Sequence, residues 1–435
     1  MGGEMRMLRF AYCIVFSLIA LIYTLDAAKP KQKGLSKQQL RRAIELHSKV
    51  SRIAEGMEWK KLRDRLDRLG KELEEVETEE ELNRIEKEID IIQKASQLYS
   101  EADSIAKEVK WAELLSRLEA LGRELERIES DEELEKIRSE IRAIKVFGQA
   151  YNLEMGIDTT RDLTAAEATY KRGIAMCPTS PYLHYLMGLM YHRGGKYADA
   201  IEQYNEAIRM DSTEAKAYYN LGLVYISEKR YDNAAKVLEK AIELDPNNSR
   251  AHNSLGIVYK RQKKYDAAIS ECQQAIKIDS SYFDAHYNLA LTYAAKKDYS
   301  NAIDEYKKAI EIDSTHVGVH YNLAIAYAKN KNYRGAIKEY RKVIALDPNN
   351  AKAHYGLATI YVYMEKYDNA IKEYKETIRI DPNYAEAYYW IGYLYKYKEE
   401  NEKAKAYLKQ YIEKEKNPRA KDKIGEAKRM LKEME

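Results

Sequence analysis

The sequence predicts an all-α protein in which a solenoid of antiparallel helix pairs follows a group of long antiparallel helices with coiled-coil character. Residues 36–146 contain an internal duplication with a period of 52, and residues 181–416 repeat every 34 residues. Fixed periods of this length are typical of stacked helical units. The 435 residues include only 19 glycines and 7 prolines, and no proline lies between Pro30 and Pro178. That stretch therefore permits very long helices.

Residues 1–28 are expected to be a hydrophobic signal or anchor segment. The stretch Phe10–Leu25 is an uncharged apolar run of 16 residues. It is long for a signal-peptide core and short of the roughly 20 residues that a full membrane span needs. Neither Ala27 nor Ala28 has a small residue two positions before it, as a cleavage site requires. We therefore expect an anchor that associates with a membrane through residues 10–25, with a removed signal as the alternative.

Two rules disagree about the side of the membrane on which the body lies. Six basic residues follow the apolar run: Lys29, Lys31, Lys33, Lys37, Arg41 and Arg42. By the positive-inside tendency they would keep the body cytoplasmic. Signal-like N-termini, in contrast, usually send the body across the membrane. The sequence leaves both orientations open, and we favour the exported side.

Overall charge and cysteine content exclude several functional classes. The 73 Lys and Arg residues nearly balance 70 Asp and Glu residues, so the net charge is +3. This balance gives no reason to expect a nucleic-acid partner. Cys13, Cys177 and Cys272 show no metal-ligand spacing and cannot form a disulfide framework. We expect them to be small packing residues.

Residues 36–146 are predicted to be a duplicated long-helix stalk. Matched pairs lie 52 residues apart: Trp59 and Trp111, Leu66 and Leu118, Leu82 and Leu134, and Ile92 and Ile144. The apolar residues of the first copy alternate spacings of four and three: Leu62, Leu66, Leu69, Leu73 and Val76. This alternation is the heptad pattern of a coiled coil.

Capping boxes indicate where the helices of the stalk begin. In this motif a hydroxyl and a Glu or Gln three residues later satisfy unpaired backbone N–H groups. The pairs are Ser36 and Gln39, Thr78 and Glu81, and Ser130 and Glu133. They predict three antiparallel helices near 37–77, 79–129 and 131–155. The second would be about 75 Å long at 1.5 Å per residue. Its charged face is expected to be solvated, and binding of a second coiled coil is the alternative.

From Pro181 onward, three residue columns recur in seven copies. A small residue stands at Gly188, Gly222, Gly256, Ala290, Ala324, Ala358 and Gly392. A tyrosine follows three residues later, at Tyr191, Tyr225, Tyr259, Tyr293, Tyr327, Tyr361 and Tyr395. Nine residues beyond stands an alanine, at Ala200, Ala234, Ala268, Ala302, Ala336, Ala370 and Ala404. Small residues permit close helix approach, and the tyrosine fills the space between the helices with its hydroxyl at the rim.

This pattern resembles the tetratricopeptide-repeat (TPR) family, in which each repeat is a pair of antiparallel helices. The resemblance implies a right-handed solenoid over residues 181–416. Residues 147–180 are interpreted as a degenerate copy, with Glu154 in the small-residue column and a capping box at Thr164 that begins its second helix. Residues 417–435 are expected to form the capping helix that shields the last apolar face.

No pattern of residues indicates catalysis, a metal or a cofactor. His252, His286, His320 and His354 recur at intervals of 34 residues. Packed helices lie about 8–10 Å apart, so neighbouring histidines of this series would not reach one zinc ion. We expect them to be packing residues. The chain contains no glycine-rich phosphate loop and no arrangement typical of a nucleophile, and we expect it not to be an enzyme.

The resemblance implies that a protein or peptide partner binds on the concave surface, which is lined by the first helix of each repeat. One column there is mostly tyrosine: Tyr185, Tyr219, Tyr287, Tyr321, Tyr355 and Tyr389. Asparagines beside it are expected to hold the backbone of an extended peptide: Asn220, Asn288 and Asn322. Basic residues are expected to fringe the groove: Lys216, Arg250 and Lys352. The alternative is that the tyrosines only pack, because this sequence has tyrosine in other columns as well.

Two functions of different classes follow. The first is a membrane-tethered scaffold or adaptor that recruits a partner segment into the groove. The second is a self-assembling homo-oligomeric scaffold that uses the stalk or the ends of the solenoid. The clamp with which some TPR proteins bind chaperone C-termini is not expected, because the Lys216–Asn220 pair is followed by no Lys–Arg pair in the next repeats.

Overall fold

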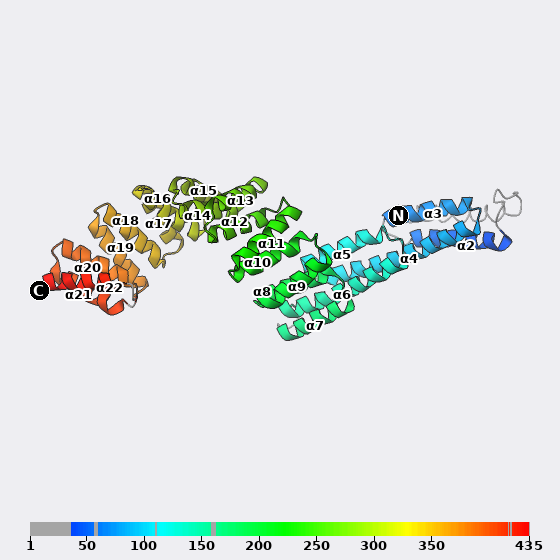
Figure 1. Cartoon of the computed structure of the whole chain (residues 1–435), viewed down its shortest axis with the longest axis horizontal. Coiled ribbons are helices and arrows are strands. Elements are labelled where there is room, and N and C mark those ends of the chain that lie inside the picture. Colours follow the sequence, from blue (N-terminus) through cyan, green and yellow to red (C-terminus); the bar gives the residue numbers. More distant parts are fainter. Residues whose placement is uncertain are drawn as a thin grey trace, which may run out of the picture. The chain divides into compact units, whose positions relative to one another are not determined.

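The computed structural model describes residues 36–55, 60–108, 111–157, 162–415, 417 and 420–434 (Figure 1). All regular secondary structure in these ranges is helical, which confirms the all-α prediction. The expected anchor at residues 10–25 lies outside them, and no helix within them is long and apolar enough to cross a membrane. The chain forms two compact units, Met1–His184 and Tyr185–Glu435, which we call unit 1 and unit 2.

Unit 1 consists of helices that contact their chain neighbours in succession (Figure 1). They are α2 (Lys37–Glu55), α3 (Lys60–Glu75), α4 (Glu79–Glu108), α5 (Ala112–Leu125), α6 (Asp131–Met155) and α7 (Leu163–Met176). The predicted helix at 37–77 is therefore wrong, because α2 and α3 are separate and pack against one another. The predicted 75 Å helix at 79–129 is likewise two helices, α4 and α5.

Trp111 explains why the second predicted helix divides. Its backbone is extended, with φ −100° and ψ 117°, and it is the N-cap residue of α5. The indole is almost fully buried and stacks on the Tyr151 ring with a centroid distance of 4.9 Å. Burying this large side chain against α6 favours an extended backbone at this position.

The two copies of the duplication share a partly buried ion pair as well as their apolar residues. Arg65 pairs with Glu88 at 2.7 Å, and Arg117 pairs with Glu140 at 2.8 Å. Burial opposes the charge of Arg117, but the Glu140 carboxylate raises the pKa of this guanidinium. The heptad residues Leu62 to Val76 are all buried.

The capping boxes are confirmed where α2, α4 and α6 begin. The predicted box at Thr164 is wrong, because Asp162 is the N-cap of α7 and accepts the backbone N–H groups of Thr164 and Ala165. The Asp162 side chain, two residues before Thr164, supplies the acceptor oxygen and lies in the N-cap position.

Glu154, in the small-residue column, accepts a hydrogen bond from the buried Tyr170 hydroxyl at 2.8 Å.

Unit 2 is a series of helix pairs in register with the 34-residue period. The first helices are α8 (Pro181–Arg193), α10 (Ala215–Ser227), α12 (Ser249–Arg261), α14 (Phe283–Ala295), α16 (Val317–Lys329), α18 (Ala351–Tyr363) and α20 (Ala385–Tyr397). The second helices are α9 (Tyr197–Met210), α11 (Tyr231–Leu244), α13 (Tyr265–Ile278), α15 (Tyr299–Ile312), α17 (Tyr333–Leu346), α19 (Tyr367–Ile380) and α21 (Asn401–Lys414). A final helix, α22 (Lys421–Glu433), packs on α21.

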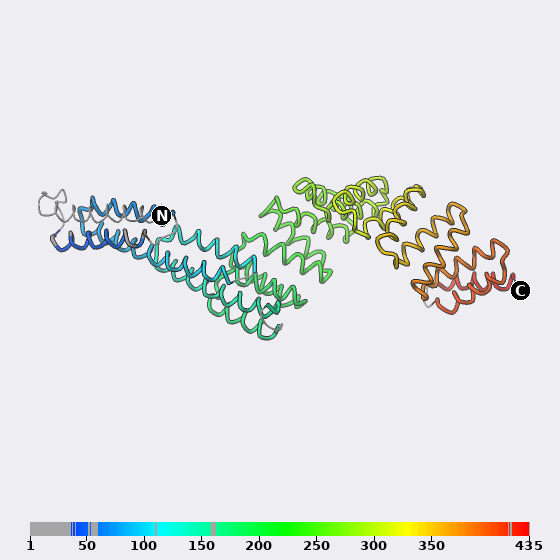
Figure 2. Tube along the Cα trace, turned by 180° about the vertical axis from the view of Figure 1, so that it is seen from behind, coloured from blue at the N-terminus to red at the C-terminus, as the bar shows by residue number. Residues whose placement is uncertain are grey.

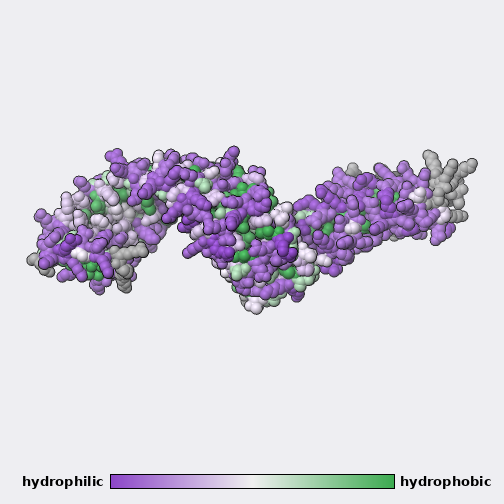
Figure 3. Space-filling model, viewed as in Figure 1, coloured by the Kyte–Doolittle hydropathy of each residue, from purple (hydrophilic) through white to green (hydrophobic). Residues whose placement is uncertain are grey.

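Small residues let the two helices of each repeat approach closely. A Cβ atom on Gly188 would lie only 2.6 Å from the ring of Tyr204 on the second helix. In the next repeat a Cβ atom on Gly222 would lie 2.7 Å from the Leu238 side chain. The alanine column of the second helices is fully buried from Ala200 to Ala404. On the face visible in Figure 3, hydrophobic residues are exposed only in small groups, so the apolar surface of each unit lies mainly inside it.

Candidate protein-binding groove

The first helices from α10 to α18 form one continuous layer. Helices of successive repeats contact each other directly: α10 with α12, α12 with α14, α14 with α16, and α16 with α18. The tube view shows this succession from behind (Figure 2). Because the first helices approach one another across repeats, their exposed residues form an extended surface. We call this surface the groove.

The predicted groove tyrosines divide into two kinds. Tyr219, Tyr287, Tyr321 and Tyr355 are half-buried, with part of each ring at the surface. Three of these rings lean on a tyrosine of the second helix, with centroid distances of 6.1 Å (Tyr287–Tyr306), 5.9 Å (Tyr321–Tyr340) and 5.3 Å (Tyr355–Tyr374). These tyrosines therefore both pack and present a surface.

The two end members of the column are buried. Tyr185 is 7% exposed and Tyr389 is 3% exposed. Tyr389 belongs to a cluster with Tyr411 and with Met430 of α22, and the Lys423 ammonium lies 4.7 Å from its ring centroid. In this structure Tyr389 is a packing residue beneath α22, and the half-buried column runs from Tyr219 to Tyr355.

The predicted asparagines bond to the preceding repeat. Nδ2 of Asn220 donates to the Tyr185 hydroxyl at 3.2 Å, and Nδ2 of Asn322 donates to the Tyr287 hydroxyl at 2.8 Å. Trp390 continues this series through its Nε1 atom, which donates to the Tyr355 hydroxyl at 3.1 Å. We call these cross-repeat bonds the tyrosine–asparagine ladder. The spacing of 35 residues joins one repeat to the next along the groove.

The ladder determines which hydrogen-bonding atoms the groove can present. A hydroxyl that accepts a bond keeps its own O–H as a donor, and a side-chain amide oxygen is an acceptor. Burial raises the pKa of Tyr287 and of Tyr321, so both phenols stay protonated at neutral pH. The predicted basic residues Lys216, Arg250 and Lys352 are exposed. The groove can therefore offer donors, acceptors and aromatic surface to an extended chain.

Sequence analysis missed a second set of groove residues, which cap the first helices. Tyr282, His316 and Tyr384 are N-cap residues. The His316 ring lies 5.6 Å from the Tyr287 ring and the Tyr384 ring lies 4.9 Å from the Tyr355 ring. Their spacing by multiples of 34 is the signal, but the other copies carry Glu214, Asn248 and Asn350, which hides the aromatic column.

The histidines of unit 2 make paired hydrogen bonds within the scaffold. Nδ1 of His252, His286, His320 and His354 lies 2.7 Å from a glutamate of the second helix. Nε2 of the first three lies 3.1–3.2 Å from the carbonyl oxygen six residues earlier. Both ring nitrogens of these three histidines are engaged, which agrees with the predicted packing role. Among the described residues, no group of three or more His, Cys, Asp or Glu could hold a metal.

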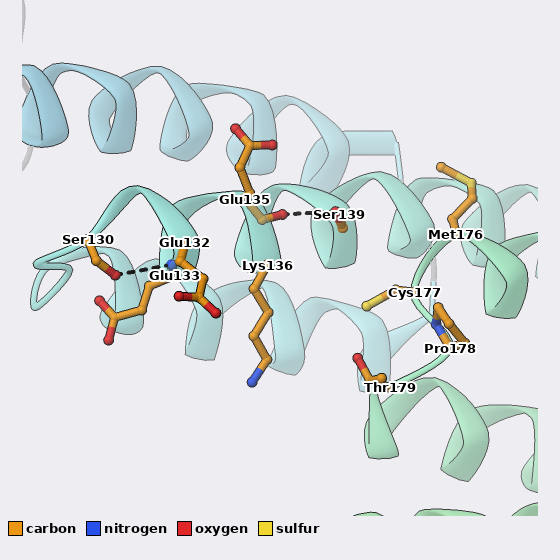
Figure 4. A pocket seen from close by; sticks show the side chains of 10 residues that line it. All are labelled: Ser130, Glu132, Glu133, Glu135, Lys136, Ser139, Met176, Cys177, Pro178 and Thr179. Carbon is orange, nitrogen blue, oxygen red and sulfur yellow. Dashed lines mark hydrogen bonds between the residues drawn. The ribbon is translucent and has the colours of Figure 1, made fainter.

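A hollow in unit 1 brings side chains together without chemistry of its own. Figure 4 shows it between the start of α6 and the segment that follows α7, with Glu132 and Lys136 on one side and Cys177 on the other. The Ser130 hydroxyl accepts the backbone N–H of Glu133 as a helix cap. Burial raises the pKa of the Cys177 thiol, which makes it a weaker nucleophile.

The fold and the ladder define unit 2 as a helical-hairpin solenoid of the class that serves as a protein-interaction scaffold. Two family models match it. The model described as "TPR repeat" matches residues 188–227, 222–263, 260–297, 292–331, 326–364 and 358–398. The model described as "Tetratricopeptide repeat" matches residues 385–416. Together they span more than half of the chain, which belongs to the tetratricopeptide-repeat family.

Similar solved structures include MamA and two chains described as TPR proteins. MamA is 26% identical, and the match covers 38% of this chain and 97% of that chain with a TM-score of 0.36. YrrB, described as a TPR protein with an unusual peptide-binding site, is 21% identical and covers 45% and 97% with a TM-score of 0.38. The C-terminal part of a TPR repeat-containing protein from Cytophaga hutchinsonii is 23% identical and covers 55% and 98% with a TM-score of 0.49. No curated protein matches the chain.

Proposed function

We propose that this protein is a non-enzymatic, membrane-tethered adaptor that binds an extended segment of a partner protein in the groove of unit 2. The observation that carries the proposal is the tyrosine–asparagine ladder. An extended segment has unpaired N–H and C=O groups that need partners when they leave water. The ladder repeats a hydroxyl and an amide along the groove, and half-buried aromatic rings beside it offer contact area at low entropic cost.

The basic fringe supports the same proposal at longer range. Lys216, Arg250 and Lys352 are exposed beside the groove. Charges of this kind contribute mainly to the rate of encounter and to partner selection, because solvent screens them in the complex. We therefore expect salt to slow association with the partner more than it speeds dissociation.

In-cell photo-crosslinking from position 321 tests the groove. A photoreactive amino acid replaces Tyr321, and captured proteins are identified by mass spectrometry. Tyr299, at the start of second helix α15, gives a matched control because it is also a half-buried tyrosine. The adaptor proposal expects one foreign protein captured from position 321 and not from position 299. Capture of the chain alone would instead favour the self-assembling scaffold.

The tether is proposed from the apolar run at residues 10–25, with the body on the exported side of the membrane. Its support is the uncharged run itself and its signal-like position. Cell fractionation with and without alkaline washing tests it, using the full chain and a deletion of residues 10–25. We expect only the full chain to stay in the membrane pellet after the wash. A protease added outside the membrane then reports the side on which unit 2 lies.

A further inference from the structure

The third repeat of unit 2 departs from its neighbours inside the groove. Asn253 stands where most repeats have a groove tyrosine, and Cys272 stands where Tyr204 and Tyr306 occupy the second helix. Two aromatic rings are thus replaced by an amide and a thiol. Both replacements are buried, with Asn253 4% exposed and Cys272 fully enclosed.

A chain of polar contacts occupies the place of these rings. Nδ2 of Asn253 donates to the Tyr282 hydroxyl at 3.4 Å, and Nδ2 of Asn288 donates to Oδ1 of Asn253 at 3.2 Å. The Lys260 ammonium then donates to Oδ1 of Asn288 at 3.4 Å. We call these four residues the polar inset. It replaces one step of the tyrosine–asparagine ladder and brings a cation into the groove.

Among the residues that the structure describes, no carboxylate pairs with the Lys260 ammonium. Its electrostatic neighbours are Cys272 and Arg261, and burial lowers its pKa. Burial also raises the pKa of the Cys272 thiol to about 12, so this thiol is neutral and supplies no counter-charge. The contrast is Lys396, at the same position of the seventh repeat, which pairs with Glu433 of α22.

Charges of both signs lie around the polar inset. Arg250 and Arg261 are exposed on the same helix. Arg250 lowers and Asp284 raises the pKa of Tyr282, whose net shift upward is caused mainly by burial. Asp284 is thus a carboxylate near the inset, and it raises the pKa of Tyr282. Among the described residues, no carboxylate shifts the pKa of Lys260. An incoming anion stabilises a half-buried ammonium in this position, because folding has already removed much of the water around the ammonium.

We propose that the polar inset makes the groove selective for an acidic segment and that Lys260 pairs with one Asp or Glu side chain of the bound partner. This inference rests on the proposed function of the groove. One ammonium flanked by side-chain amides matches the single charge of a carboxylate. A phosphate, with nearly two charges at neutral pH, requires more than one close cation.

Selection of peptides on the full chain tests the inference. A phage-displayed library of random dodecapeptides is selected on the immobilised protein, and synthetic copies are measured by fluorescence anisotropy. We expect an Asp or Glu at one recurrent position. Its replacement by Asn or Gln weakens binding to the wild type by at least about tenfold, which corresponds to 1.4 kcal/mol. The same replacement in the peptide should have little effect on binding to the Lys260→Met variant of the protein. The Lys396→Met variant should respond to it as the wild type does.

Three results would separate the two claims. Peptides that lose affinity with Tyr321→Ala but carry no recurrent acidic residue overturn the inference and leave the groove proposal intact. Selection of phosphopeptides over their Glu counterparts in a direct competition also overturns it. Peptides that bind Tyr321→Ala as well as the wild type, or failure to select any peptide, overturn the groove proposal and the inference with it.

Thermal melting gives a test that needs no ligand. Lys260→Met removes a desolvated charge that has no counter-charge, so the variant should melt at the same temperature as the wild type or higher. Lys260→Gln should fold as well and serves as a second variant. A melting temperature lowered by several degrees in both would show that Lys260 stabilises the free chain, and it would overturn its assignment to a partner carboxylate.

Discussion

At the scale of single residues, His252, His286 and His320 each join a second helix to the turn that precedes their own helix. His286 contacts the Glu305 carboxylate at 2.7 Å and the Ser280 carbonyl at 3.2 Å. Two acceptors are both satisfied only by the doubly protonated ring, which has two donors. The hydrogen bond with Glu305 accordingly raises the pKa of His286 above its ordinary 6.5. Burial opposes ionisation of Glu305, but the bonds from His286 and Lys308 lower its pKa below its ordinary 4.5.

The substitution His286→Tyr tests this bridge, because the chain itself has tyrosine in this column at Tyr218 and Tyr388. The Tyr388 hydroxyl reaches the equivalent carbonyl, that of Pro382, so packing is retained while the charge pair is lost. The raised His286 pKa contributes stability that is present below about pH 6.5 and is lost as pH rises through the folded pKa. The lowered Glu305 pKa contributes stability that is lost as pH falls below about 4.5.

The advantage of the wild type over His286→Tyr should therefore be greatest between about pH 4.5 and 6.5. Hydrogen bonds to charged groups contribute about 1.5–3 kcal/mol, and the difference should shrink by pH 8.5. Urea unfolding of both proteins across this range measures it. A difference that grows with pH would contradict the assigned protonation.

Buried tyrosines of the second helix should matter more for stability than rim tyrosines of the first. Tyr306 is 1% exposed, whereas Tyr293 is half-buried and its hydroxyl accepts a 3.4 Å bond from Gln273. We expect Tyr306→Ala to cost about 3–5 kcal/mol and Tyr293→Ala about half as much. Thermal melts compare them directly. An unchanged melting temperature for Tyr293→Ala would show that the tyrosine column of the first helices is not part of the core.

At the scale of elements, the turn within a repeat holds one residue in the left-handed region. The residues concerned are Gly195, Lys229, Lys263, Lys297, Lys331, Glu365 and Glu399. Only the first repeat uses glycine, although side chains cost free energy in this conformation. Six repeats therefore carry strain of the backbone at the same turn.

The substitution Lys297→Gly should relieve this strain at one turn. Lys297 has φ 68°, and replacing it should stabilise the chain by up to about 1 kcal/mol. The neighbouring Lys296, with φ −73° and ψ −5°, provides the control, because glycine there relieves no strain, adds freedom to the unfolded chain and removes the exposed ion pair with Asp266. We expect the urea midpoint to rise for the first variant and fall for the second. Equal shifts would show that φ is not the cause.

Most helices could be predicted from sequence because the columns repeat in one register. The helices of unit 2 follow from the spacing of small residue, tyrosine and alanine. The division at Trp111 could not be predicted from turn residues, because residues 105–113 contain no proline or glycine and an indole cannot accept a capping bond. The groove columns were also predictable, but the bonds between Asn322 and Tyr287 depend on how one repeat is rotated against the next, which no spacing along the chain reveals.

At the scale of the whole molecule, α22 covers the last apolar face of unit 2. Leu408 and Tyr411 are fully buried in the cluster that α22 completes with Met430. Removal of residues 421–435 should destabilise the last repeat by about 3 kcal/mol or more, since burying one large apolar side chain contributes about 1.5–3 kcal/mol. Hydrogen exchange should then speed up in α21 before it does in α12. Uniform exchange along unit 2 would contradict a capping role.

The central claim is that one extended segment of a partner follows the ladder from repeat to repeat. Photo-crosslinking from positions 219, 287 and 355, with the crosslinked partner peptides sequenced, tests it most directly. We expect crosslinks to successive residues of a single segment, in the order of the repeats. Crosslinks scattered over several segments of the partner, or formed only with this chain itself, would contradict it.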